Sequence, residues 1–112
     1  MPSNYKFEDR LKLSEKERVL LIALLKGRMN KYFLGQQLML DNSEDSRISN
    51  GTLYPALKRL KVMGIVVEHA DGIEKATSGP DIEVTAMGRE VLSWELMRLQ
   101  DQINLAKERY RK

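Results

Sequence analysis

Basic side chains gather in one stretch of the chain, a pattern typical of a surface that binds a polyanion. Residues 46–67 hold four basic residues and no acidic one, although the whole chain has 16 acidic residues, 19 basic residues and a net charge of +3. The four are Arg47, Lys58, Arg59 and Lys61. Residues 68–83 have five acidic residues and one lysine, for a net charge of −4. Because cations that neutralise phosphates release counterions, the basic stretch predicts DNA binding whose affinity falls with salt.

The chain lacks the residue combinations that enzymes and metal sites use. It has no cysteine and a single histidine, His69, so neither a Cys/His nucleophile pair nor a transition-metal site is expected. Adjacent carboxylates, such as Glu8-Asp9 and Glu44-Asp45, lie in polar stretches that are typical of solvated surface. We therefore expect a protein that is not an enzyme and that needs no cofactor or metal.

The basic residues lie on a predicted helix with an apolar back. Three residues recur at helical spacing and would face a core: Leu53, Leu57 and Leu60. Three more recur at that spacing on another face: Tyr54, Lys58 and Lys61. A helix with an apolar back and an acid-free basic front suits the DNA major groove. Because proline is tolerated in a first turn, Pro55 favours a start near Thr52, or else an irregular first turn, and Gly64 marks the end.

A first helix is predicted from a capping box. Ser14 and Glu17 have the spacing at which serine and glutamate satisfy each other's backbone amides. The helix should run to about Lys26, with Gly27 as its stop. Its segment Val19–Leu25 is apolar on all sides, which predicts that other elements or another chain surround it.

Another helix and two strands complete the predicted domain. Residues 28–31 read as a turn and residues 31–40 as a second helix, followed by a polar loop at residues 41–46. The β-branched residues 65–69 and the alternating residues 81–85 predict two strands of a hairpin. A hairpin that follows a helix-turn-helix is the order of a winged helix.

The last helix, from residue 85 to about 109, has an apolar seam at heptad spacing. The seam residues are Leu92, Leu96, Leu99, Ile103, Ala106 and Tyr110. About 25 residues at 1.5 Å each give a helix of roughly 37 Å, longer than so small a domain can cover. Val91, Trp94 and Met97 lie outside the seam and would be exposed unless they meet something. We therefore expect a homodimer that buries this helix, with the partner's first helix as one candidate surface.

These elements predict one mostly helical α+β protein with the winged helix-turn-helix fold. Its parts would be an N-terminal arm at residues 1–13, a DNA-binding domain at residues 14–84 and a dimerisation helix at residues 85–112. The longest apolar run is too short to span a bilayer, and the charged N-terminus lacks a signal-peptide core. We expect a cytoplasmic protein that does not bind membranes.

Two runs of sequence carry a family resemblance: residues 51–60, GTLYPALKRL, followed by Gly64-Ile65-Val66, and residues 84–92, VTAMGREVL. They resemble the signatures of the PadR-type transcriptional regulators, in particular the compact branch with a single C-terminal helix. The resemblance implies a winged helix-turn-helix repressor that dimerises through its C-terminal helix. It also implies a palindromic operator and, in many members, release of DNA when a small molecule binds.

The sequence departs from the family pattern in three places. The turn at residues 27–32 lacks the usual glycine-proline and histidine-glycine pairs, and residues 76–82 of the wing are short of cations. Some compact members stack flat ligands on a tryptophan of the last helix, which would lie nearer Leu99 here. The ligand site of the family is therefore not carried over to this chain. Trp94 is expected to pack in the dimer core, with contact to a small-molecule effector as the alternative.

The function predicted is that of a dimeric repressor that binds double-stranded DNA through the third helix. Its candidate DNA contacts are Arg47, Asn50, Gly51, Thr52, Tyr54, Lys58, Arg59 and Lys61. The alternative for the basic residues is a solvated surface, and for Tyr54 it is packing between the second and third helices. The rival function is a winged-helix protein-interaction module that does not read DNA, which the acidic wing favours because it would repel phosphates.

Overall fold

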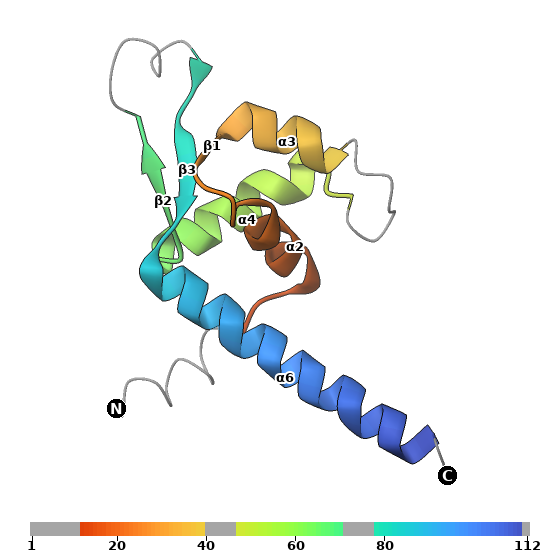
Figure 1. Cartoon of the computed structure of the whole chain (residues 1–112). Coiled ribbons are helices and arrows are strands. Elements are labelled where there is room, and N and C mark those ends of the chain that lie inside the picture. Colours follow the sequence, from red (N-terminus) through yellow and green to blue (C-terminus); the bar gives the residue numbers. More distant parts are fainter. Residues whose placement is uncertain (1–11, 40–46, 71–77, 111–112) are drawn as a thin grey trace.

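The computed structural model describes residues 12–39, 47–70 and 78–110. Its elements in order are α2 (Glu15–Ala23), β1 (Met29–Asn30), α3 (Lys31–Met39), α4 (Asn50–Val62), β2 (Val66–His69), β3 (Asp81–Val84) and α6 (Ala86–Tyr110). Figure 1 shows α2, α3 and α4 packed together beside a small sheet, with α6 leaving the body as a long rod. The expected mostly helical α+β architecture is confirmed, whereas the predicted N-terminal arm and the polar loop at residues 41–46 fall largely or wholly outside the described residues.

The capping box predicted for the first helix is confirmed at the start of α2. The Ser14 Oγ accepts the Glu17 backbone N–H at 3.1 Å, and the Ser14 N–H donates to the Glu17 Oε1 at 2.8 Å. The helix ends at Ala23, three residues before the predicted end. The chain already turns at Leu24, whose side chain is fully buried, and Gly27 has a φ of +146°. The helix therefore ends where the chain turns at Leu24, which packs into the core, and not at Lys26.

A third strand was missing from the sequence prediction. Met29 and Asn30, expected in a turn, form β1 and pair antiparallel with Ile82 and Asp81 of β3. The sheet therefore has the strand order β1-β3-β2. A strand of two residues is too short to show an alternating pattern, so only its distant partner identifies it.

The predicted hairpin is confirmed, with β2 and β3 antiparallel. Val66 pairs with Val84 and His69 pairs with Asp81, and the loop at residues 71–77 lies outside the described residues. Ile82 and Val84 turn their side chains into the core. The sheet thereby packs on the helices through one face.

The helix α4 begins two residues before the start near Thr52 that Pro55 favoured. The helix begins at Asn50, and the backbone N–H groups of Thr52 and Leu53 donate to the Ser49 carbonyl at 3.0 and 2.8 Å. Pro55 therefore lies inside the helix, where its missing N–H leaves one carbonyl without a helical partner. Both Pro55 and the residue four positions earlier are exposed, so water can satisfy that carbonyl.

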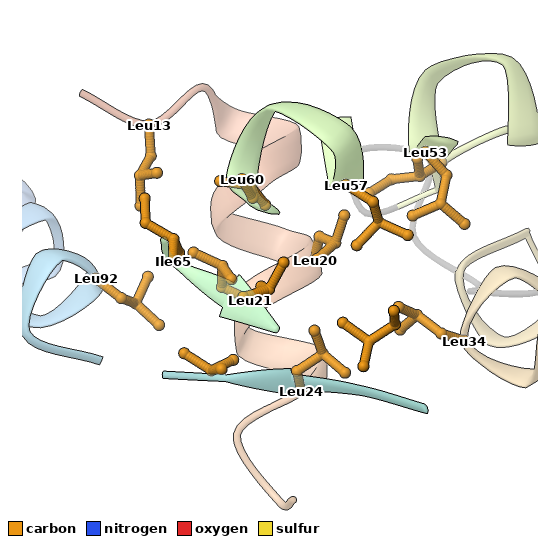
Figure 2. Packing of buried hydrophobic residues seen from close by; sticks show 14 of the residues in the cluster. Leu13, Leu20, Leu21, Leu24, Leu34, Leu53, Leu57, Leu60, Ile65 and Leu92 are labelled. Carbon is orange, nitrogen blue, oxygen red and sulfur yellow. The ribbon is translucent and has the colours of Figure 1, made fainter. Parts of the chain in front are cut away.

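A leucine-rich core joins α2, α4, the sheet and the first turns of α6 (Figure 2). Gly88 lets α6 approach closely, since a Cβ there would lie 2.2 Å from the Ile65 carbonyl oxygen. Val91 and Leu92 are both buried in this core. Leu92, expected in the dimer seam, thus belongs to the domain itself, and the exposed part of the seam begins at Leu96.

Candidate nucleic-acid interface

The helix α4 presents a polar front over its leucine back. Leu53, Leu57 and Leu60 are buried, as their spacing predicted. The exposed residues of the helix are Asn50, Gly51, Thr52, Pro55, Lys58, Arg59, Lys61 and Val62. No carboxylate lies on the helix itself, so any neutralisation of its cations has to come from other elements.

Such neutralisation occurs at both edges of the front. Arg59 Nη1 contacts the Glu17 Oε2 of α2 at one edge. Lys61 Nζ donates to the Glu68 Oε1 of β2 at 3.1 Å at the other edge. Lys58, between them on the exposed surface, makes no ion pair with the residues that the structure describes. Of the three cations on α4, Lys58 is thus the one that has no carboxylate partner among residues 12–39, 47–70 and 78–110.

A hollow of about 420 Å³ adjoins the first turn of α4. Its lining residues are Lys16, Met39, Arg47, Ile48, Ser49 and Thr52. Lys16 Nζ donates to the Arg47 carbonyl at 2.9 Å, so α2 brings a second cation to this rim. Sequence reasoning missed Lys16 because it lies on α2, outside the acid-free stretch at residues 46–67.

Two polar residues of α4 interact with α3. Tyr54 is half-buried against the core, and Lys31 Nζ lies 5.1 Å from its ring centroid, within cation–π range. The Tyr54 ring thus packs against the core, as the packing alternative expected, and Lys31 adds a cation beside this ring. Asn50 extends over Gly35, where a Cβ would lie 3.2 Å from the Asn50 Oδ1.

The surface of the first α4 turn is smooth at Gly51, meaning that no side chain covers the exposed backbone there. A Cβ at this position would meet only the Ser49 Oγ, at 3.9 Å, and the side chain of Ser49 makes no capping hydrogen bond. The fold itself therefore does not require a glycine here. The missing side chain leaves the backbone of the turn open to close approach from outside.

The described strands of the wing carry acids and no lysine or arginine, in agreement with the cation-poor wing seen in the sequence. All three of these acids have partners: besides the Lys61–Glu68 pair, the Arg28 Nε lies 3.3 Å from the Asp81 Oδ2, and the His69 Nε2 lies 2.7 Å from the Glu83 Oε1. The pairs with Lys61 and Arg28 reduce the negative field of the wing without making it attractive to phosphate.

The second half of α6 projects beyond the core and keeps an apolar stripe. The exposed apolar residues there are Leu96, Met97, Ile103, Leu105 and Tyr110. Of these, Leu96, Ile103 and Tyr110 form the stripe at heptad spacing, whereas Leu105 lies on the opposite face of the helix. A hollow of about 450 Å³ lies where α6 leaves the body, lined by Leu25, Arg89, Leu92, Ser93, Leu96, Met97 and Gln100. Trp94 is half-buried and is not among the residues that line this hollow.

Nowhere in residues 12–39, 47–70 and 78–110 do three histidine, cysteine or carboxylate side chains lie close enough together to hold a metal ion. These ranges also contain no helix that is both long enough and apolar enough to cross a membrane.

Solved structures share this fold. A PadR family transcription regulator from Clostridium difficile R20291 has a TM-score of 0.68 at 18% identity, over 85% of this chain and 97% of that one. A PadR-like transcription factor from Bacteroides fragilis has a TM-score of 0.67 at 19% identity, over 97% of each chain. A transcriptional regulator from Clostridium thermocellum has a TM-score of 0.67 at 17% identity, over 82% and 86%.

The similarity is one of structure rather than sequence. No protein-family model matches the chain, and no curated protein matches it. The predicted winged-helix fold is nevertheless confirmed, and the chain is structurally similar to PadR-family and related winged-helix transcriptional regulators.

Proposed function

We propose that this protein is a DNA-binding transcriptional repressor that reads a palindromic operator as a homodimer through α4. The observation that carries the proposal is the front of α4, an acid-free helix surface with a smooth first turn and an exposed Lys58. The similarity to solved transcriptional regulators supports the same reading, because in a winged-helix protein the second helix of the helix-turn-helix enters the major groove.

Different side chains have different tasks in this proposal. Lys58 contacts phosphate from the middle of the helix, while Arg47 and Thr52 contact the backbone beside its first turn. Lys16 and Lys31, which the sequence did not single out, add cations from α2 and α3. Asn50 is the α4 side chain whose amide could bond bidentately to adenine.

The homodimer follows from the projecting half of α6. Its apolar side chains Leu96, Ile103 and Tyr110 are exposed within the described chain, as are Ile22 of α2 and Leu25 just after this helix. Pairing of two such helices buries both stripes and sets two copies of α4 on one face of a duplex. A separation of about 34–36 Å then matches successive major grooves.

The test is selection of DNA from a random pool, followed by titration of the selected palindrome at about 50 mM salt. We expect a complex of two chains per duplex, and a palindrome with one half-site scrambled should bind more weakly. A charge-reversed Lys58→Glu protein is the matched control and should lose affinity for every duplex. Failure of the unaltered protein to bind any DNA at low salt would contradict the proposal.

A second candidate function is supported by a specific observation: two of the three α4 cations are already paired with Glu17 and Glu68. A surface so neutralised suits a protein-interaction module that keeps the winged fold without reading DNA. Capture of partners with and without nuclease treatment separates the two functions. Partners that persist after nuclease treatment, together with no DNA binding, favour the module.

An effector site at Trp94 belongs to the same proposal. Trp94 is the single tryptophan of the chain, so its fluorescence reports on its own surroundings. Titration with planar cationic dyes should quench this fluorescence if flat ligands stack on the ring. Absence of quenching removes Trp94 as a ligand contact.

A further inference from the structure

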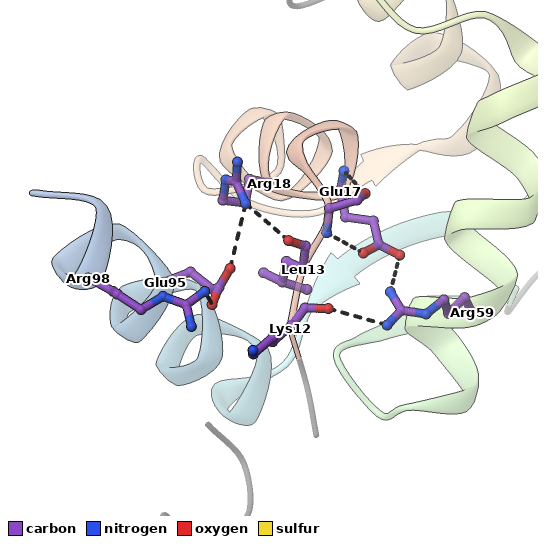
Figure 3. A network of polar contacts seen from close by, with 8 residues as sticks. Lys12, Leu13, Glu17, Arg18, Arg59, Glu95 and Arg98 are labelled. Atoms are coloured by element: carbon purple, nitrogen blue, oxygen red, sulfur yellow. Dashed lines mark hydrogen bonds and ion pairs between the residues drawn. The ribbon is translucent and has the colours of Figure 1, made fainter. Parts of the chain in front are cut away.

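A chain of polar contacts links α4 to α6 behind the leucine core. Figure 3 shows α6 on one side, α4 on the other, and α2 with the segment Lys12–Ser14 between them. The side chains in this chain of contacts are Glu17, Arg18, Arg59, Glu95 and Arg98. None of these charged side chains belongs to the apolar core, so packing of the core does not explain why they lie together.

Glu17 has two tasks at once. Its side chain is only 5% exposed. One carboxylate oxygen accepts the Ser14 N–H at 2.8 Å in the capping box, and the other binds Arg59 of α4. A carboxylate this buried requires a charged partner, because removal from water disfavours an unpaired ion. The position of Arg59, and with it that of α4, is therefore tied to the start of α2.

The segment Lys12–Ser14 is held at each of its three residues. The Arg59 Nη2 donates to the Lys12 carbonyl at 3.3 Å, and the Arg18 Nη1 donates to the Leu13 carbonyl at 3.0 Å. The Glu17 carboxylate accepts a hydrogen bond from the Ser14 N–H, as described above. We name this three-residue segment the strap.

The other end of the contact chain lies on α6. The Arg18 Nη1 is 3.5 Å from the Glu95 Oε2, and Glu95 also binds Arg98. Glu95 is 6% exposed, and its Oε2 has no hydrogen bond, so the attraction to Arg18 is the interaction that this oxygen has within the described residues. The α6 helix is thus joined to the strap through Arg18, just as α4 is joined to it through Arg59.

We propose that the strap and its two arginines fix the position of α4 relative to α6, and that Glu17 and Arg59 are positioning residues rather than DNA contacts. The role in DNA reading rests on the proposed function. In a dimer joined through α6, the angle between α4 and α6 determines the separation of the two α4 helices. That separation selects the spacing of the operator half-sites.

The first arm of the test measures geometry without DNA. The chain has no cysteine, so spin labels can be placed at Val62→Cys on α4 and Asp101→Cys on α6, both exposed positions. Labelled chains are diluted with unlabelled ones, so that the pulsed dipolar spectrum reports the distance within one chain. We expect a narrow distribution for the unaltered protein.

Arg59→Lys is the variant that tests the strap without leaving Glu17 unpaired. An ammonium group can neutralise Glu17, but it lacks the fork with which a guanidinium reaches both the carboxylate and the Lys12 carbonyl. We expect a broadened distance distribution for Arg59→Lys, and for Arg18→Lys at the α6 end. Lys61→Ala is the matched control, because it breaks an ion pair of α4 outside the strap and should leave the distribution narrow.

The second arm measures DNA reading with the selected palindrome and with spacers changed by one base pair. The unaltered protein should prefer one spacing by about tenfold, and Arg59→Lys should lower this preference to about threefold or less. Affinity for a single half-site and its salt dependence should not change, since Arg59 does not touch phosphate. A uniform loss of stability cannot produce a change confined to this ratio.

The outcomes separate the inference from the function on which it rests. An unchanged distance distribution in both arginine variants overturns the strap, whether or not DNA binds. A broadened distribution with an unchanged spacing preference overturns the role of the strap in DNA reading. A salt slope lowered by about one unit in Arg59→Lys makes Arg59 a phosphate contact and overturns its positioning role. If the unaltered protein binds no DNA, the proposed function fails, while the first arm still decides the geometry.

Discussion

Lys61 Nζ lies 3.1 Å from the Glu68 Oε1, so a cation of the α4 front is already paired with a carboxylate of β2, the first strand of the wing. The Lys61 side chain is 55% exposed and that of Glu68 is 26% exposed. Such a pair adds little to folding stability, because water screens it. Its consequence is electrostatic, since a phosphate near Lys61 also meets the carboxylate of Glu68. Lys58 and Lys61 are both lysines of the same helix face, but in the proposed complex Lys58 should bind phosphate more strongly than Lys61 does.

The first prediction concerns the salt dependence of DNA binding. Lys58→Ala should lower the slope of log affinity against log salt by about one unit, because one phosphate contact is lost. The double variant Lys61→Ala/Glu68→Gln removes the ion pair as a unit and leaves the local charge unchanged. Its slope should equal that of the unaltered protein. Anisotropy titrations over a salt series measure both, and a drop of about one unit in the double variant would mean that Lys61 leaves Glu68 for phosphate.

A second prediction separates stability from binding at Gly51. A Cβ there meets nothing closer than 3.9 Å, so Gly51→Ala should stabilise the fold by about 0.4–1 kcal/mol through the unfolded chain. The same methyl group occupies the smooth surface of α4 and should weaken DNA binding. Urea unfolding at fixed protein concentration and DNA titration give the two values. Stabilisation without any loss of affinity would show that DNA does not approach this turn closely.

The charges of α4 also show how far sequence reasoning extends. The leucine spacing and the Ser14–Glu17 capping box are local patterns, so they predicted the buried faces and a helix start correctly. The acid-free stretch was also real, but its neutralising carboxylates come from Glu17, 42 positions before Arg59, and from Glu68 just beyond the stretch. A charge count along a segment cannot include acids that folding brings to it from elsewhere.

The same limit explains the other differences. β1 consists of two residues whose partners lie some 50 positions further on, so no local pattern could identify it. Leu92 fits the heptad spacing of the seam and is nevertheless buried in the domain. Periodicity gives the face of a helix on which a residue lies, but not whether its neighbour there is the same chain or another.

A third prediction concerns Gly88, a helical glycine whose surroundings are crowded where those of Gly51 are open. A Cβ at Gly88 would stand 2.2 Å from the Ile65 carbonyl oxygen and 2.9 Å from the Val84 Cγ1. Because the first of these is a backbone atom, α6 would have to move away from the sheet. Gly88→Ala should therefore destabilise the fold by about 3 kcal/mol, at the upper end of the usual cost of overpacking.

Gly51→Ala is the matched control for this change, since both substitutions replace a helical glycine by alanine. Urea unfolding should move the two midpoints in opposite directions. Equal midpoints for the two variants would contradict the close contact between α6 and Ile65.

The last prediction concerns association through the projecting half of α6. Ile103 is 48% exposed and lies on the seam between Leu99 and Ala106, beyond the last residue that the core buries. Ile103→Asp places a charge where two apolar stripes would meet. Because an unpaired carboxylate in an apolar interface is strongly disfavoured, sedimentation should show mainly single chains at micromolar concentration. Asn104→Asp adds the same charge one position away, off the seam, and should leave the association intact.

DNA affinity should follow the association, since a single chain holds only one α4. Ile103→Asp should therefore bind the full palindrome about as weakly as the unaltered protein binds one half-site. Equal association of the two aspartate variants would place the interface on another surface.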